Sequence, residues 1–123
     1  MNTEQLLEHA KAILDGLLTS SPRTTRIAAF LIRQALETEV DAYCEFLVMP
    51  IGHPVRMRSR LAVLHVLDQH GLARIAEYTW NALSRACHHH AYELSPTISE
   101  LRHLHAEVAR LASLRAVIAV DAA

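Results

Sequence analysis

The sequence predicts an all-α protein, an up-and-down bundle of four or five helices in a single domain over residues 1–123. Apolar residues recur at three- and four-residue steps, and no alternating strand pattern competes with them. Only three residues are glycine and 51% are hydrophobic. Short clusters of Pro, Gly and Ser divide the chain into segments of helical length. A chain of this size can bury a core without disulfides or a metal.

The first helix is expected from Thr3, as its N-cap, to about Thr19. Its apolar face is formed by Leu6, Leu7, Ala10, Ile13, Leu14, Leu17 and Leu18. Ser20, Ser21 and Pro22 interrupt this pattern. Ser21 is suited to cap a second helix, with Pro22 in its first turn.

The second helix should run to about Leu47, before the Pro- and Gly-containing loop at residues 49–54. The residues of its inward stripe are Ile27, Phe30, Leu31, Leu36, Val40, Tyr43, Cys44 and Leu47. Its outer face carries an acidic cluster of Glu37, Glu39, Asp41 and Glu45. A surface helix of this kind packs one face on the core and leaves the charged face to solvent.

A third, shorter helix is expected over Val55–His70, with Gly71 at the C-terminal cap position. Its inward residues are Met57, Leu61, Leu64 and Leu67. The fourth helix should run from Leu72 to about Glu93, before the stop at residues 94–96.

The fifth helix should begin at a capping box formed by Thr97 and Glu100. Its apolar residues are Ile98, Leu101, Leu104, Val108, Leu111 and Ile118. These five segments, joined by short connections, give the predicted bundle.

Composition limits the classes of partner. The 12 basic and 13 acidic side chains leave a formal net charge of −1. This balance predicts no general attraction to nucleic acid or anionic membranes, so any RNA contact must use a local patch. The longest apolar run, 27–32, is too short to span a bilayer. Cys44 and Cys87 lack C-x-x-C spacing, which favours reduced thiols and a cytoplasmic protein.

One stretch of the predicted fourth helix combines residue types that carry chemistry. Residues 85–92 read RACHHHAY, with Arg85, His90 and Tyr92 in R-x4-H-x-Y spacing. This stretch resembles the motif of the HEPN domains, a large family of small helical bundles marked by R-x4–6-H near the end of a late helix. The longer form resembles the HEPN toxins that are paired with minimal nucleotidyltransferases.

The resemblance implies a HEPN-like fold and a metal-independent endoribonuclease of the toxin or defence type, without a cofactor. Arg85 and His90 would form a composite site at a homodimer interface, and Tyr92 would be a site of regulatory nucleotide addition. RNA is then the substrate, and an antitoxin or nucleotidyltransferase the partner protein. The alternative is a non-catalytic HEPN-like module that binds a nucleotide or a partner protein. A dimerisation bundle unrelated to the family also stays open.

Arg and His suit this reaction for chemical reasons. RNA is cut without metal when its 2′-OH attacks the adjacent phosphate. A base must then remove the 2′ proton and an acid must protonate the leaving 5′ oxygen, which imidazole can do near pH 7. A planar guanidinium can hold two oxygens of the negatively charged intermediate. One His per chain is too few for both proton transfers, whereas a two-fold dimer would supply two.

In a straight helix, Arg85 and His90 would lie on opposite faces and could not act together. His90 falls on the apolar stripe centred on Leu83, whereas Arg85 and Tyr92 point the opposite way. The catalytic interpretation therefore needs an opened turn near residues 88–90, or a dimer seam that meets both faces. His89, which shares the outward face with Arg85, is the reserve candidate.

Two further features are a cluster of arginines and a run of histidines. Arg56, Arg58 and Arg60 cluster at a helix start, where basic residues are unfavourable. They are expected to contact RNA phosphates or the acidic face of another chain, or else to form a solvated surface. Consecutive His residues at 88–90 point in different directions and cannot bind one ion together, so we expect no metal site.

Overall fold

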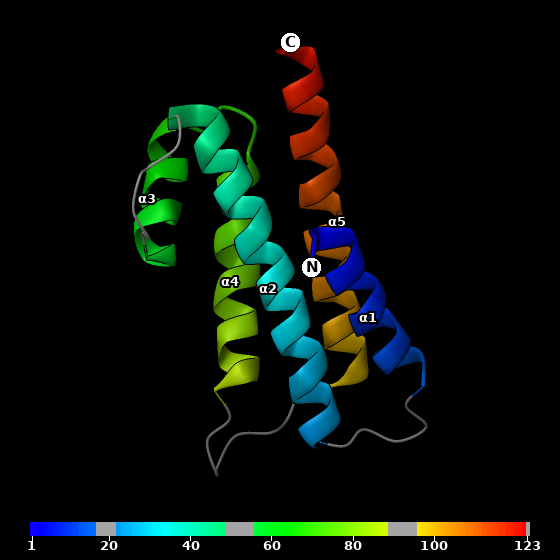
Figure 1. Cartoon of the computed structure of the whole chain (residues 1–123). Helices are drawn as coiled ribbons and strands as arrows, with labels where there is room; N and C mark the ends of the chain where they lie inside the picture. Colours follow the sequence, from blue (N-terminus) through cyan, green and yellow to red (C-terminus); the bar gives the residue numbers. More distant parts are fainter. Residues whose placement is uncertain (17–21, 49–55, 89–95, 123) are drawn as a thin grey trace.

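The computed structural model of the chain describes residues 1–16, 22–48, 56–88 and 96–122 (Figure 1). These ranges hold helices and their connecting turns, and no strand. The helices are α1 (Thr3–Asp15), α2 (Pro22–Val48), α3 (Met57–Leu67), α4 (Leu72–Cys87) and α5 (Ile98–Asp121). Within the same ranges, no helix is both long and apolar enough to cross a membrane.

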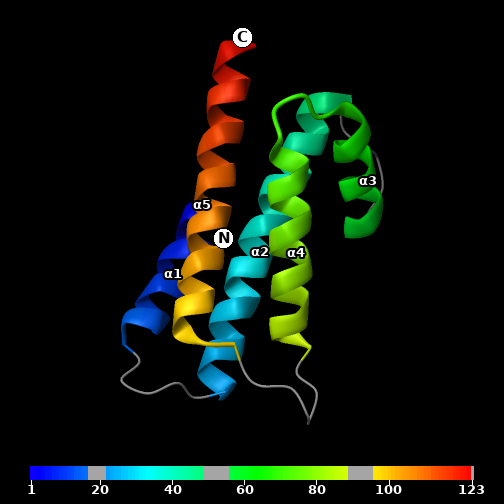
Figure 2. The ribbon, with the colours of Figure 1, turned by 180° about the vertical axis from the view of Figure 1, so that it is seen from behind.

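Four of the helices form an up-and-down bundle. In Figure 1, α2 and α5 run upward towards the C-terminus, whereas α1 and α4 run downward. The long α2 contacts each of the other four helices, and α4 and α5 contact one another. The short α3 lies against one end of α2 and α4, as the view from behind also shows (Figure 2). The predicted all-α bundle is thus confirmed.

The side of α2 that faces the bundle is made of small and large apolar residues together. Ala28, Ala29 and Ala35 are fully buried, and their small side chains let neighbouring helices approach closely. Larger side chains fill the layers between them. The largest fully buried apolar residues are Leu14, Ile32, Leu36, Val40, Tyr43, Leu64, Leu72, Leu83, Leu101 and Val108.

The predicted faces of α2 are wrong at three positions. Ile27 and Phe30, placed in the core by the sequence pattern, are 47% and 51% exposed. Ala28 and Ala29 take the inward positions instead, and a pattern that ranks residues by hydrophobicity underrates alanine. Glu39, placed on the outer face, is buried and forms an ion pair with Arg115 of α5. The sequence could not show that α5 packs over this side of α2.

The hydrogen bonds at the helix ends agree with the predicted ones only in part. Asn2, not Thr3, is the N-cap of α1, because its side chain accepts from the Gln5 backbone and the Gln5 side chain accepts in return. The described helix ends at Asp15 rather than near Thr19. At the start of α5, the Thr97 side chain accepts a hydrogen bond from the Glu100 amide at 3.0 Å, which confirms Thr97 as the N-cap. The reciprocal bond of the predicted capping box, from the Thr97 amide to the Glu100 side chain, is not found among the described residues.

The turn between α3 and α4 depends on one carboxylate. Asp68 accepts hydrogen bonds from the Tyr43 hydroxyl at 2.5 Å, the His70 amide at 3.0 Å and the Ala73 amide at 2.9 Å. Asp68 thus joins α2 to the turn and satisfies a free amide in the first turn of α4. Gly71, predicted as the cap of the third helix, is instead the N-cap of α4, with a left-handed φ of 82°.

Two more helices are shorter than predicted. The third ends at Leu67 rather than His70, because the chain turns at Asp68. Leu67, predicted to face inward, is therefore 40% exposed at the helix end. The fourth ends at Cys87 rather than near Glu93, with the non-helical His88 as its C-cap.

We predict that Asp68→Ala lowers the free energy of unfolding by about 2–3 kcal/mol at neutral pH, because the buried Tyr43 hydroxyl loses its acceptor. Burial raises the pKa of the Asp68 carboxyl, but the hydrogen bonds from Tyr43, Ala73 and His70 outweigh it and leave the pKa below its ordinary value. The stabilisation is therefore full above the unfolded-state pKa of about 3.9 and is lost as the pH falls through the folded-state pKa.

Urea denaturation of wild type and Asp68→Ala at pH 7 and pH 3 measures this effect. Tyr43→Phe, which removes a single hydrogen bond, should cost only about 1 kcal/mol. A difference between wild type and Asp68→Ala that is the same at both pH values would contradict the role of the ionised carboxylate.

Candidate functional site

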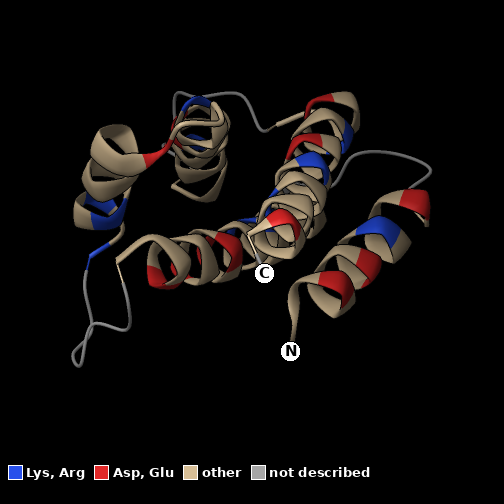
Figure 3. Cartoon of the chain, turned by 90° about the horizontal axis from the view of Figure 1, so that it is seen from above, with Lys and Arg blue, Asp and Glu red and all other residues tan. Residues whose placement is uncertain are grey.

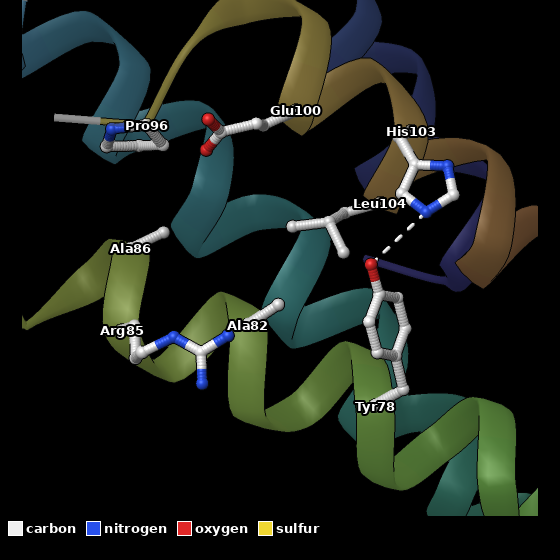
Figure 4. Close-up of a pocket in the computed structure, with 8 residues that line it drawn as sticks. All are labelled: Tyr78, Ala82, Arg85, Ala86, Pro96, Glu100, His103 and Leu104. Atoms are coloured by element: carbon white, nitrogen blue, oxygen red, sulfur yellow. Dashed lines mark hydrogen bonds between the residues drawn. The ribbon is translucent and has the colours of Figure 1, made fainter.

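Arg85, the first residue of the R-x4-H-x-Y motif, lies in a groove of about 390 Å³ between α4 and α5 (Figure 4). The groove is lined by Tyr78, Ala82, Arg85, Ala86, Pro96, Glu100, His103 and Leu104. It holds a cationic, an anionic, an imidazole and a phenol side chain in one depression. Such a grouping of polar side chains around an apolar floor is typical of a ligand site.

Helical spacing explains how α4 builds its side of the groove. Tyr78, Ala82, Arg85 and Ala86 stand at i, i+4, i+7 and i+8, and so share one face of the helix. The small side chain of Ala82 leaves open space between Tyr78 and Arg85, and Ala86 lines the groove beyond Arg85. The opposite wall comes from the first two turns of α5, the helix that begins at the Thr97 cap.

Arg85 is exposed and takes part in none of the ion pairs found among the described residues. Its guanidinium extends over the groove in the direction of Ala82 (Figure 4). Arg33 of α2 is in the opposite situation. Its guanidinium carbon lies 4.3 Å from the centroid of the Trp80 ring, and its Nε lies 3.4 Å from a Glu37 carboxylate oxygen. Arg33 is thus held by an aromatic ring and a carboxylate, whereas Arg85 has no ion-pair partner among the described residues.

Tyr78 and His103 form the other end of the groove. The Tyr78 hydroxyl lies 3.4 Å from His103 Nε2, which is a long hydrogen bond, and the two rings meet edge to face at 6.0 Å between centroids. The Tyr78 side chain is 52% exposed. A large aromatic ring therefore stands partly free beside the groove, held in place by one weak polar contact.

The structure confirms only part of the predicted motif geometry. Arg85 faces away from the buried Leu83, as expected. The other motif residues, His90 and Tyr92, and the reserve candidate His89 lie outside the described residues. The objection based on opposite faces assumed a helix to about Glu93. Since α4 ends at Cys87, that assumption is wrong, and it no longer opposes the pairing of Arg85 with His90.

Sequence reasoning missed Tyr78, Glu100 and His103 as neighbours of Arg85. The i, i+7 spacing of Tyr78 and Arg85 was a usable signal, because it puts both on one helix face. Glu100 and His103 gave no comparable signal, since their approach depends on how α5 packs against α4.

The predicted basic cluster is divided by its contacts. Arg60 forms an ion pair with Asp41 of the same chain at 2.8 Å, so the acidic face that it meets is not that of another chain. Arg56 and Arg58 are exposed, and Arg58 lines a second groove in which His65 and Glu77 are joined by a hydrogen bond. Acidic and basic positions are spread over the helices rather than gathered on one side (Figure 3).

The cysteine before the His run is not an activated thiol. Burial raises the pKa of the Cys87 thiol above its ordinary value, although a hydrogen bond with Arg33 lowers it. Cys44 is also free and buried. In the described part of the chain, no three His, Cys, Asp or Glu side chains gather in a way that could hold a metal ion. The chemistry available in the groove is therefore that of a cation, a carboxylate, an imidazole and a phenol.

Comparison with protein-family models, curated proteins and solved structures found no match. The HEPN resemblance therefore depends on the motif and on the helical character of the chain.

We predict that Arg85→Ala leaves the free energy of unfolding within about 0.5 kcal/mol of wild type, since an exposed side chain without an ion pair contributes little. Arg33→Ala should cost about 1–2 kcal/mol, because it removes the contacts with Trp80 and Glu37. Urea denaturation measures both. A loss of stability in Arg85→Ala as large as that in Arg33→Ala would indicate that Arg85 is a structural residue.

Proposed function

We propose that the protein is a metal-independent endoribonuclease of the toxin or defence type, related to the HEPN domains. Arg85 and His90 would form its composite site at a homodimer interface. The single observation that supports this proposal is the state of Arg85, which is exposed in a groove without an ion pair among the described residues. A guanidinium in this state can bind a phosphate in a bidentate manner without first breaking a salt bridge.

The proposed reaction needs only the RNA and the protein's own side chains. The 2′ oxygen attacks the adjacent phosphorus while an imidazole takes the 2′ proton. The bond from phosphorus to the 5′ oxygen breaks, and a second imidazole gives that oxygen a proton. The products are a 2′,3′-cyclic phosphate and a 5′-hydroxyl end. Arg85 would stabilise the negative charge that gathers on the phosphorane.

The second imidazole would come from the other protomer. A two-fold axis that passes close to the ends of both α4 helices would place two Arg85 and two His90 side chains around one phosphate. In this arrangement Arg56 and Arg58 would contact more distant phosphates. Neither shares an ion pair with any described residue.

A second candidate function is a non-catalytic module of the same fold, which binds a nucleotide or a partner protein. The observation that favours it is Ala86, which is buried and lines the groove directly after Arg85. HEPN ribonucleases often carry a polar residue at this position. A module without that residue could keep the phosphate contact of Arg85 and lack the cleavage step.

We predict that the wild-type protein cleaves end-labelled single-stranded RNA or tRNA in the presence of EDTA. Arg85→Ala and His90→Ala should each reduce the cleavage rate at least 100-fold, since a positioned acid or base and a charge-stabilising donor are each worth about 10²-fold or more. The ends of the products, analysed by mass spectrometry, should be 2′,3′-cyclic phosphates.

Arg74→Ala is the matched control, because Arg74 is an exposed arginine of α4 that does not line the groove. Its rate should equal that of wild type. A folded, dimeric wild type that cleaves neither RNA, or a cleavage rate that survives both site variants, would contradict the ribonuclease. The first of these results would favour the binding module.

A further inference from the structure

We infer that the groove between α4 and α5 binds one nucleotide, with its base stacked on Tyr78 and its phosphate held by Arg85. Cleavage at the bound phosphate rests on the proposed ribonuclease function. Binding of the nucleotide does not require that cleavage. It assigns roles to Tyr78, Glu100 and His103, which belong to no part of the R-x4-H-x-Y motif.

The aromatic end of the groove suits a nucleobase. Tyr78 is 52% exposed, whereas the other large apolar residues of α4 are buried or half-buried. Stacking on such a ring is how proteins bind unpaired bases, and it tolerates any base because every base has a π-face. The edge-to-face contact with His103 fixes the plane of the Tyr78 ring and leaves the rest of it free.

The charged end suits a phosphate. Arg85 follows Tyr78 by seven residues on the same face of α4, which corresponds to about 10 Å along the helix. That separation is of the order of one nucleotide, from the face of the base to its phosphate. Ala82 is the groove-lining residue of α4 between them, and its small side chain leaves space for a sugar under the Arg85 guanidinium, which extends towards it (Figure 4).

The volume and the charge of the groove limit the ligand. About 390 Å³ lies near the lower end of the range for small-molecule sites, which fits one nucleotide rather than several. Glu100 puts a carboxylate on the wall opposite Arg85 (Figure 4). It can accept a hydrogen bond from a ribose hydroxyl or a base amino group, and it disfavours a ligand with several phosphates. A nucleotide with one phosphate fits a groove that holds one arginine and one carboxylate, because the arginine can bind the phosphate and the carboxylate can bind a hydroxyl or an amino group.

An accessible base with one phosphate occurs both in a nucleotide within single-stranded RNA and in a free nucleoside monophosphate. Double-stranded RNA does not offer such a base, because its bases are stacked inside the helix and cannot reach Tyr78. The proposed endoribonuclease requires the first source. A nucleotide-binding module would use the second.

The test is the affinity of the His90→Ala protein, in which cleavage is blocked, for a fluorescein-labelled ten-nucleotide single-stranded RNA and for AMP and CMP. Fluorescence anisotropy suits the RNA and calorimetry suits the nucleotides. Tyr78→Ala and Arg85→Ala, each added to this background, should weaken binding about tenfold or more. Tyr78→Phe should retain most of the affinity because the ring is kept. Arg74→Ala should bind normally.

Each result separates the binding inference from the proposed cleavage. Dependence on Tyr78 and Arg85 supports the inference even if the wild-type protein cleaves no RNA, and a preference for RNA over AMP or CMP identifies the strand as the source. If Tyr78→Ala changes neither the cleavage rate nor the affinity for RNA, the nucleotide-binding inference is overturned, whereas the proposed ribonuclease function is not. Equal weakening by Arg74→Ala, equal binding of double-stranded RNA, or no binding of any probe would also overturn it.

Discussion

The whole arrangement depends on α2, a 27-residue helix that contacts all four of the others. Its buried alanines have small side chains that let neighbouring helices approach closely, and none of the other described helices contacts all the rest. Polar contacts then fix the neighbours in register. Tyr43 of α2 binds Asp68 at the start of the turn to α4, and Glu39 binds Arg115 of α5. The positions of α4 and α5, and so the groove between them, follow from these contacts.

The contrast between Arg33 and Arg85 follows from this arrangement. Both are arginines near the same end of the bundle, but one lies between α2 and α4 and the other faces the side of α4 that meets α5. The first is held by an aromatic ring and a carboxylate. The second lies beside a groove with the Glu100 carboxylate on the far wall, and the two form no ion pair, so a ligand can reach Arg85 from the groove without displacing part of the core.

The sequence predicted the number and order of the helices, because hydrophobic period and Pro or Gly breaks are local signals. It failed where the outcome depends on neighbouring helices. Nothing local distinguishes Glu39, which is buried against Arg115, from the exposed acidic residues around it. The end of α4 at Cys87, rather than near Glu93, was missed for another reason, since residues 88–93 contain no strong helix breaker.

The same division applies to the candidate site. The motif identified Arg85, and its exposure agrees with the helical pattern. The partners of Arg85 in the groove could not be predicted, because Glu100 and His103 reach it from another helix. Arg60 was predicted to contact RNA phosphates or another chain, but it forms an ion pair with Asp41 of its own chain.

We propose above that RNA binds the face formed by α4 and α5. The most direct measurement is a ¹H–¹⁵N NMR titration of the His90→Ala protein with a short single-stranded RNA. If RNA binds in the groove, shift changes should concentrate at Tyr78, Arg85 and His103 and be absent from the outer face of α2 around Phe30. Changes centred on α2, or none at saturating RNA, would contradict it.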